Sequence, residues 1–209
     1  MHQVIGWAAP TGLLNQQSKL EEYPMPNYKR ARFGSTYFFT VVTYQRRKIL
    51  CLEPCREILR NVIKQARDAY PFTIEAVVLL PEHLHCIWKL PENDTNYSMR
   101  WGWIKKEFTK RARDVVEKMV GTAHPTASRV KHGEGRIWQR RFWEHQIRDQ
   151  KDYNAHVEYI HYNPVKHGLA KAPKDWEYSS FSRYVKDGIY DREWGAGREI
   201  TFDGAIGNE

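Results

Sequence analysis

Residues 74–89 read IEAVVLLPEHLHCIWK, and this stretch decides the fold. Its first half is an apolar run rich in β-branched residues, and its second half alternates His, Leu, His, Cys, Ile and Trp. Runs of this kind are typical of β-strands, and the pair Pro81-Glu82 between them is typical of a tight turn. The stretch therefore predicts two strands, at 74–80 and 83–89, joined as a hairpin.

Two histidines, His83 and His85, open the second of these strands. Residues two positions apart on a strand point to the same face of the sheet, so both imidazoles converge on one point. Two converging imidazoles make half of a divalent-metal site. A His-x-His pair also occurs in purely structural roles, so the missing ligand and the chemistry have to come from the rest of the chain.

Further elements are expected on both sides of the hairpin. Residues 35–44 are rich in aromatic and β-branched side chains and predict a strand. Apolar residues at helical spacing over 55–69 predict one helix, with Pro54 where the first helical residue would be, and a second helix is predicted over 97–120. The core face of the second helix is predicted to be Ile104, Phe108, Ala112, Val115 and Met119, and a separate face carries Lys106, Lys110 and Arg113.

A last strand is expected around 142–147 and a third helix over 149–163, after a loop at 121–135. The predicted order is therefore β-α-β-β-α-β-α. This is the order of a ferredoxin-like split βαβ sheet with an added C-terminal helix, which is an α+β fold.

The composition points to a nucleic-acid partner. The 209 residues carry a net charge of +8 and include eight Trp and twelve Tyr. Excess cations with many planar rings are typical of nucleic-acid binders, and stacking rings favour single strands. The alternative is that the rings form the core and the charges are solvated surface. Three cysteines suit a reducing cytoplasm, and no apolar stretch reaches membrane-spanning length.

The third predicted helix presents two stripes of side chains. The core stripe is expected to be Tyr153, Val157 and Ile160. The second stripe consists of Asp152, His156, Tyr159 and Asn163. Asp149 is a plausible N-cap, and Pro164 is expected to end the helix at about Asn163.

Asn163 has two readings. Its carbonyl oxygen could join His83 and His85 as a metal ligand, and a mixed N/O set with open positions suits Mg or Mn at a phosphoryl-transfer centre. It could instead be a simple C-terminal helix cap. Tyr159 lies one turn away on the same side of the helix.

Several motifs, in this order, resemble one known family. His83-Leu84-His85 is similar to the HUH signature, which is two histidines around a bulky hydrophobic residue. The run YIHYNPVKHG at 159–168 resembles the catalytic helix of the REP-associated tyrosine transposases. IWQRRFWEHQIRD at 137–149 and WEYSSF at 176–181 also resemble that family, and the resemblance covers residues 28–184.

The resemblance implies a metal-dependent single-stranded DNA transposase or endonuclease. Tyr159 is implied as the nucleophile, and His83, His85 and Asn163 as the ligands of Mg or Mn. Attack by the phenol would form a 5′-phosphotyrosine link and release a 3′-hydroxyl, and the stored ester would let strands rejoin without ATP. The implied partner is single-stranded DNA folded into hairpins of palindromic repeats.

Contacts with DNA are expected where cations alternate with rings. The candidate DNA-binding residues are Tyr28, Lys29, Arg30, Arg32, Arg136, Trp138, Arg140, Arg141, Lys166 and His167. For Trp138 and Phe142 the alternative is core packing.

Two other functions stay open at this point. One is a non-catalytic binder of hairpin DNA or RNA, and the other is a metal-dependent nuclease that uses water and in which Tyr159 is structural. We expect an N-terminal extension at 1–27, a catalytic domain at 28–184 and a C-terminal tail at 185–209. The expected setting is the bacterial cytoplasm, associated with the nucleoid and without a membrane partner, and either a monomer or a dimer fits the sequence.

Overall fold

The computed structural model describes residues 34–120, 137–202 and 206. Four strands form one antiparallel sheet in the order β2-β3-β1-β4. The strands are β1 (Thr36–Val42), β2 (Thr73–Leu79), β3 (His83–Lys89) and β4 (Trp143–Gln146). This order is that of a ferredoxin-like split βαβ sheet, which confirms the predicted α+β fold.

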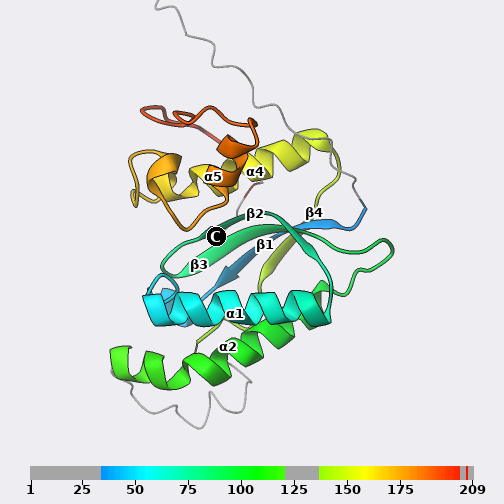
Figure 1. Cartoon of the computed structure of the whole chain (residues 1–209), viewed down its shortest axis with the longest axis vertical. Helices are drawn as coiled ribbons and strands as arrows, with labels where there is room; N and C mark the ends of the chain where they lie inside the picture. The colour runs from blue at the N-terminus through cyan, green and yellow to red at the C-terminus, as the bar shows by residue number, and fades with distance from the viewer. Residues whose placement is uncertain (1–33, 121–136, 203–205, 207–209) are drawn as a thin grey trace, which may run out of the picture.

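Helices cover both faces of the sheet. Figure 1 shows α1 (Glu53–Ala69) and α2 (Tyr97–Val120) on one face, and α4 (Gln150–Lys166) with the short α5 (Phe181–Lys186) on the other. Two 3-10 helices, Tyr44–Arg46 and Pro173–Asp175, complete the described elements. Among the described residues, no helix is long and apolar enough to cross a lipid bilayer.

The alternation of β3 divides its side chains between two cores. Leu84, Cys86 and Trp88 belong to the core beneath α1 and α2. Ile87 belongs to the core beneath α4, and His83 and His85 share its face of the strand. The sheet therefore presents the histidine pair to α4, as the predicted strand requires.

Helix α2 has the predicted bounds, but the predicted core face is wrong at one position. Met119 is 51% exposed, whereas Val116 is buried. The stripe through Ile104, Phe108 and Ala112 continues at a spacing of four to Val116. With 3.6 residues per turn, the stripe can continue from Ala112 to Val115 or to Val116. In the fold, Val116 is the residue buried in the core that α1 shares.

Helix α4 begins as predicted and ends later than predicted. Asp149 is the N-cap, and its side chain accepts a hydrogen bond from the backbone nitrogen of Asp152 at 2.8 Å. The helix continues past Pro164 to Lys166, and the C-cap is His167. A proline removes one backbone donor, but the nitrogen of His167 still donates to the carbonyl of Asn163 at 3.0 Å. The helix-cap reading of Asn163 is therefore wrong.

The described part of the segment after 184, which was expected to be a tail, packs on the domain. Ile189, Tyr190 and Trp194 are buried in the core beneath α4. The 176–181 motif attaches this region to β2, because the indole of Trp176 donates to the carbonyl of Leu79 at 3.0 Å. The expected N-terminal extension and the loop at 121–135 lie outside the described residues.

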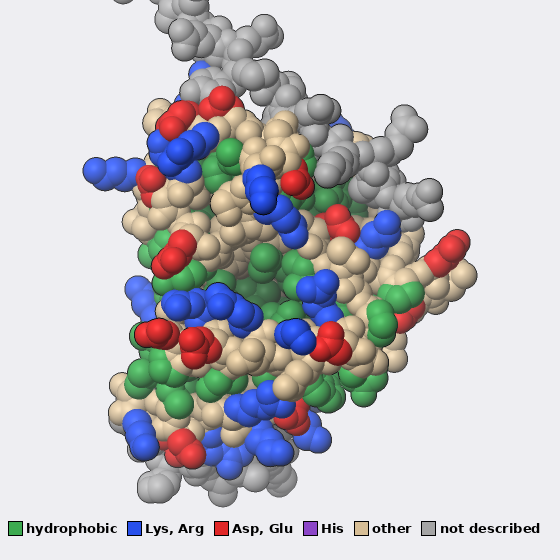
Figure 2. Space-filling view, in the orientation of Figure 1, with side chains coloured by type: hydrophobic (Ala, Val, Ile, Leu, Met, Phe, Trp, Pro, Cys, Tyr) green, Lys and Arg blue, Asp and Glu red, His purple; other side chains and the backbone are tan. Residues whose placement is uncertain are grey.

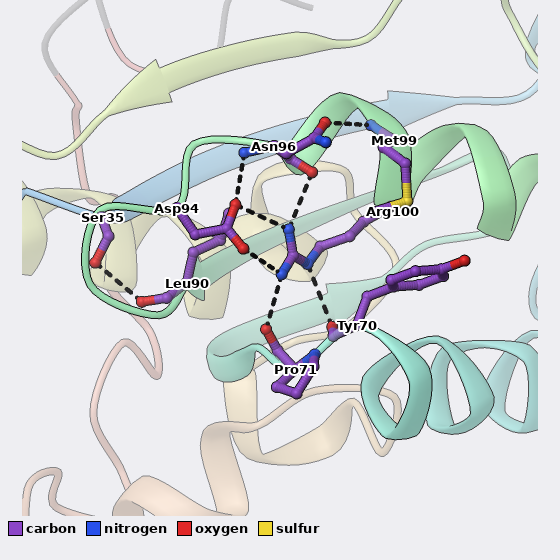
Figure 3. A network of polar contacts seen from close by, with 8 residues as sticks. All are labelled: Ser35, Tyr70, Pro71, Leu90, Asp94, Asn96, Met99 and Arg100. Atoms are coloured by element: carbon purple, nitrogen blue, oxygen red, sulfur yellow. Dashed lines mark hydrogen bonds and ion pairs between the residues drawn. The ribbon is translucent and has the colours of Figure 1, made fainter.

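A buried arginine joins the two helices of the other face. Figure 3 shows the guanidinium of Arg100 between the end of α1 and the start of α2. It donates to both oxygens of Asp94, at 3.2 and 2.7 Å, and to the carbonyls of Tyr70, Pro71 and Asn96. These contacts use all five donors of the side chain. Arg100 therefore has a structural role.

Candidate active site

The histidine pair is buried and held by oxygen atoms. The rings of His83 and His85 are completely buried, with centroids 4.8 Å apart. His85 Nδ1 lies 2.9 Å from the hydroxyl of Thr40 on β1, and His83 Nδ1 lies 3.2 Å from a carboxylate oxygen of Glu82. Metal-binding imidazoles commonly use one ring nitrogen in this way, which fixes the ring and assigns Nε2 to the metal.

Helix α4 lines up three residues over this pair. Tyr159, Asn163 and His167 are spaced by four, so they lie along one side of the helix. The ring of Tyr159 is 5.2 Å from that of His85, and the ring of His167 is 5.2 Å from that of His83. Asn163 is four residues from each of them, so it lies between the two contacts along this side of the helix.

The carboxamide of Asn163 supports its reading as a ligand. The residue is completely buried, and neither Oδ1 nor Nδ2 has a hydrogen-bond partner among the residues that the structure describes. An unsatisfied buried amide costs about 1–3 kcal/mol, so it calls for an explanation. A cation bound at Oδ1 would supply one.

The predicted nucleophile lies beside these groups. Tyr159 is 1% exposed, and its hydroxyl oxygen is 3.2 Å from Lys166 Nζ. The same ammonium lies 4.8 Å from the centre of the phenol ring. On another side, Phe202 meets the ring edge-on at 5.4 Å between centroids. The phenol is therefore enclosed, with a cation at its oxygen.

A second cluster joins β4 to the start of α4. The ligand atoms of His145, Asp152 and His156 lie within 4.8 Å of one another, so the group could hold a metal ion. His145 Nε2 is 2.8 Å from one carboxylate oxygen of Asp152, and that oxygen also accepts from the backbone of Arg148 at 2.9 Å. The sequence placed Asp152 and His156 on one stripe but did not bring His145 to them.

Hydrogen bonds connect the members of this cluster, but they leave the buried Nε2 of His156 without a partner among the described residues, so the cluster fits both an ionic anchor and a metal site. His156 Nδ1 lies 2.8 Å from the backbone carbonyl of Asp152, which only accepts, so this nitrogen carries a proton. Burial alone would raise the pKa of Asp152, but hydrogen bonds from His145 and Arg148 hold it below its usual value. Burial lowers the pKa of His156. An ionised carboxylate thus anchors the first turn of α4 to β4.

The candidate DNA-binding residues that the structure describes fall into three groups, and the rest lie outside the described residues. Arg140 and Arg141 are exposed just before β4. Lys166 and His167 lie at the candidate active site. The ring of Trp138 is 3% exposed and packs against Phe108, so Trp138 is a core residue, as the alternative interpretation expected. Phe142 is half-buried against the same core. The others, Tyr28, Lys29, Arg30, Arg32 and Arg136, lie outside the described residues.

A basic groove lies between α2 and the segment before β4. Its volume is about 460 Å³, and its lining is Lys105, Lys106, Thr109, Lys110, Arg113, Trp138, Gln139 and Arg140. Lys105 donates to the carbonyl of Gln139 at 3.0 Å, and burial lowers its pKa to about 8. Figure 2 shows Lys and Arg side chains spread over the part of the molecule where α1 and α2 lie. Nothing in the sequence alone indicates that Arg140 lies beside the cations of α2.

Known proteins resemble this chain in sequence and fold. Residues 31–163 match the family model described as "Transposase IS200 like". A REP-associated tyrosine transposase of Escherichia coli is 44% identical over 171 residues, which cover 81% of this chain and 91% of that protein. A provisionally named REP-associated tyrosine transposase of Haemophilus influenzae is 43% identical over 183 residues, 87% of this chain and all of that protein.

A solved structure also resembles this chain. The structure of a REP-associated tyrosine transposase bound to a REP hairpin superimposes with a TM-score of 0.66 at 40% identity. The match covers 88% of this chain and 99% of that one. The chain therefore belongs to the IS200-like transposases and, within them, to the REP-associated tyrosine transposases.

Proposed function

We propose that the protein cleaves and rejoins single-stranded DNA at palindromic hairpins, through a 5′-phosphotyrosine link to Tyr159. One observation carries the proposal. Tyr159 of α4 contacts His85 of β3, and His167, the C-cap of α4, contacts His83, although the two segments are far apart in the sequence. The relative bound to a REP hairpin supports the choice of DNA substrate.

A divalent ion, Mg or Mn, fits the residues present. The two Nε2 atoms and Asn163 Oδ1 would be its ligands, and the unsatisfied carboxamide of Asn163 is the observation that favours this set. A bound ion would polarise the scissile phosphate and offset the charge that develops on it. Thr40 and Glu82 hold the imidazoles in the orientation that such a site needs.

The surroundings of Tyr159 suit transfer better than hydrolysis. Its ring is enclosed by His85 and Phe202 and is 1% exposed. A phosphotyrosine formed in such a place meets little water, so a DNA hydroxyl aligned with it competes well as the acceptor. The released 3′-hydroxyl can then restore the strand or be replaced by another.

DNA would reach the site past exposed cations. Arg140, Arg141 and the basic groove supply charges for the phosphates of a hairpin stem, which bind without reading sequence. Lys166 and His167 lie close enough to the candidate nucleophile and ligands to meet the scissile region.

Denaturing electrophoresis of the protein with a labelled single-stranded palindromic hairpin and Mn or Mg tests the proposal. We expect a covalent protein–DNA band from the wild type and none from Tyr159→Phe. Tyr153→Phe is the matched control, because it removes another buried phenol of α4, one bonded to the hydroxyl of Tyr184 at 3.2 Å. It should keep the band.

Other outcomes select the competing functions. Cleavage that persists in Tyr159→Phe without a covalent band would identify a nuclease that uses water. Tight hairpin binding by a wild type that forms no adduct would identify a non-catalytic binder. Either result overturns the proposed phosphotyrosine chemistry.

A further inference from the structure

We propose that Lys166 is a catalytic residue, whose ammonium stabilises negative charge on the phenolic oxygen of Tyr159 while the bond to phosphorus forms and breaks. The inference rests on the proposed function and goes beyond it. In the sequence, Lys166 was a candidate for contact with DNA. Its position in the fold assigns it to the nucleophile instead.

The contact is direct and has a defined direction. Lys166 Nζ lies 3.2 Å from the hydroxyl oxygen of Tyr159 and 4.8 Å from the ring centre. Seven residues are about two helical turns, so both side chains emerge on one side of α4. An ammonium only donates, so the phenolic oxygen accepts, and its own proton points away from the lysine.

The extension of α4 past Pro164 creates this contact. A helix that ended at Asn163 would leave Lys166 in the following loop, whereas the observed helix carries it to its last residue. The side chain reaches back over the phenol while the residue itself stays exposed. The phenol is almost completely buried, so the attraction between ammonium and oxygen is less screened than at an open surface.

Charge appears on this oxygen in both directions of the reaction. In cleavage, the phosphorus–Oη bond forms and the phosphorus–O3′ bond breaks. The phenol proton passes to water, and the departing 3′ oxygen takes a proton from water. In rejoining, a 3′-hydroxyl gives its proton to water and forms the phosphorus–O3′ bond, the phosphorus–Oη bond breaks, and Tyr159 leaves as a phenolate beside Lys166. One cation at Oη therefore assists both steps.

Two substitutions separate charge from shape. Lys166→Met keeps an unbranched apolar stem and removes the charge, and Lys166→Arg keeps the charge. The measurements are the single-turnover rate of adduct formation at saturating hairpin, the rate of rejoining from isolated adduct, and the hairpin Kd. We expect Lys166→Met to slow both rates about 100-fold, with a Kd within about twofold of the wild type. Lys166→Arg should recover part of both rates.

Lys151→Met is the matched control, since Lys151 is exposed at the other end of α4. It should leave both rates unchanged. The melting temperature of each variant shows that slow reaction does not reflect unfolding.

Several results would overturn the inference. If Lys166→Met weakens binding, makes its salt dependence shallower by about 0.7 and reacts normally at saturating DNA, then Lys166 only contacts a phosphate. Equal loss in folded Lys166→Met and Lys166→Arg would show that shape, not charge, matters. A wild type that forms no adduct overturns the proposed function itself, whereas a normal wild-type adduct with an unaffected Lys166→Met overturns this inference alone.

Discussion

At the scale of single residues, the carboxamide of Asn163 contrasts with the guanidinium of Arg100. The amide is buried and lacks hydrogen bonds among the described residues, whereas the buried guanidinium of Arg100 satisfies every donor. The indoles of Trp101 and Trp138 are also buried without a partner among the described residues, but an indole only donates, whereas the oxygen of Asn163 can bind a cation. The contrast is why we interpret Asn163 as a ligand.

Replacing Asn163 with Ala should abolish the stabilisation of the protein by Mn. A metal that binds only the folded state raises its stability, by about 2.7 kcal/mol at a hundredfold excess over Kd. Thermal unfolding with and without Mn measures the effect. The wild type should melt at a higher temperature with Mn, and Asn163→Ala should not respond.

Asn154→Ala is the control for this prediction, because Asn154 lies on the same helix and its side chain pairs with Gln150 at 2.7 Å. It should keep the response to Mn. An equal response in Asn163→Ala would remove Asn163 from the ligand set.

At the scale of elements, sequence patterns found the parts whose cause is local. The bounds of β3 and α2, the N-cap of α4 and its core stripe of Tyr153, Val157 and Ile160 all follow from periodicity and capping, and all are observed. The histidine pair meets α4 because a strand alternates.

Sequence patterns did not predict contacts between segments that are far apart in the chain. His145 comes to the start of α4 only because β4 pairs with β1 in a register that puts His145 opposite Phe38. The packing of Tyr190 and Trp194 under α4 comes from a segment rich in Gly and charged residues, which has no clear period. Nothing local in the sequence specifies either contact.

The junction of α1 and α2 depends on the hydrogen bonds of Arg100 to Asp94 and to three backbone carbonyls, which we call the Arg100 clamp. Lys in its place keeps the charge but offers three donors in place of five, so buried carbonyls lose their partners. We expect Arg100→Lys to lower the free energy of unfolding by about 3 kcal/mol at pH 7, measured by urea denaturation. Adduct formation at saturating DNA should persist, since the clamp lies on the opposite face of the sheet from α4.

The same clamp gives a dependence on pH. The hydrogen bond from Arg100 lowers the pKa of Asp94, so the folded state favours the ionised carboxylate. The stabilisation is complete above the ordinary value of about 3.9 and is lost as pH falls through the lowered value. The difference between wild type and Arg100→Lys should therefore shrink below about pH 4. If the difference in the free energy of unfolding between the two proteins stays constant down to pH 2, the ionised carboxylate of Asp94 does not contribute to the stability that Arg100 provides.

At the scale of the whole molecule, the two faces of the sheet carry different features. The α4 face holds the candidate chemistry, and the α2 face carries the basic groove. A hairpin has a duplex stem and single-stranded flanks, and the proposed function implies that the groove would bind the stem while a flank would enter the site beside α4. Binding and chemistry should then be separable by mutation.

Neutralising the groove should weaken binding without slowing chemistry. The variant Lys106→Gln, Lys110→Gln, Arg113→Gln removes three exposed cations of α2. We expect the dependence of log Kd on log salt to become shallower by about 0.9 for each phosphate that the variant no longer neutralises. The adduct rate at saturating hairpin should stay within about twofold of the wild type. Filter binding over a salt series and single-turnover assays give the two numbers.

Arg60→Gln with Lys64→Gln, on exposed positions of α1, is the comparison for general loss of charge. It should change the salt dependence little. If both sets change it equally, the protein binds DNA through diffuse charge and the groove has no special role.

The most direct test of the central claim is mass spectrometry of the protein–DNA adduct after proteolysis. The phosphotyrosine account predicts a nucleotide esterified to the oxygen of Tyr159, in the peptide that also contains Asn163. A nucleotide on Tyr162, or on any other residue, would contradict the account. So would complete cleavage of the hairpin by a protein that carries no nucleotide.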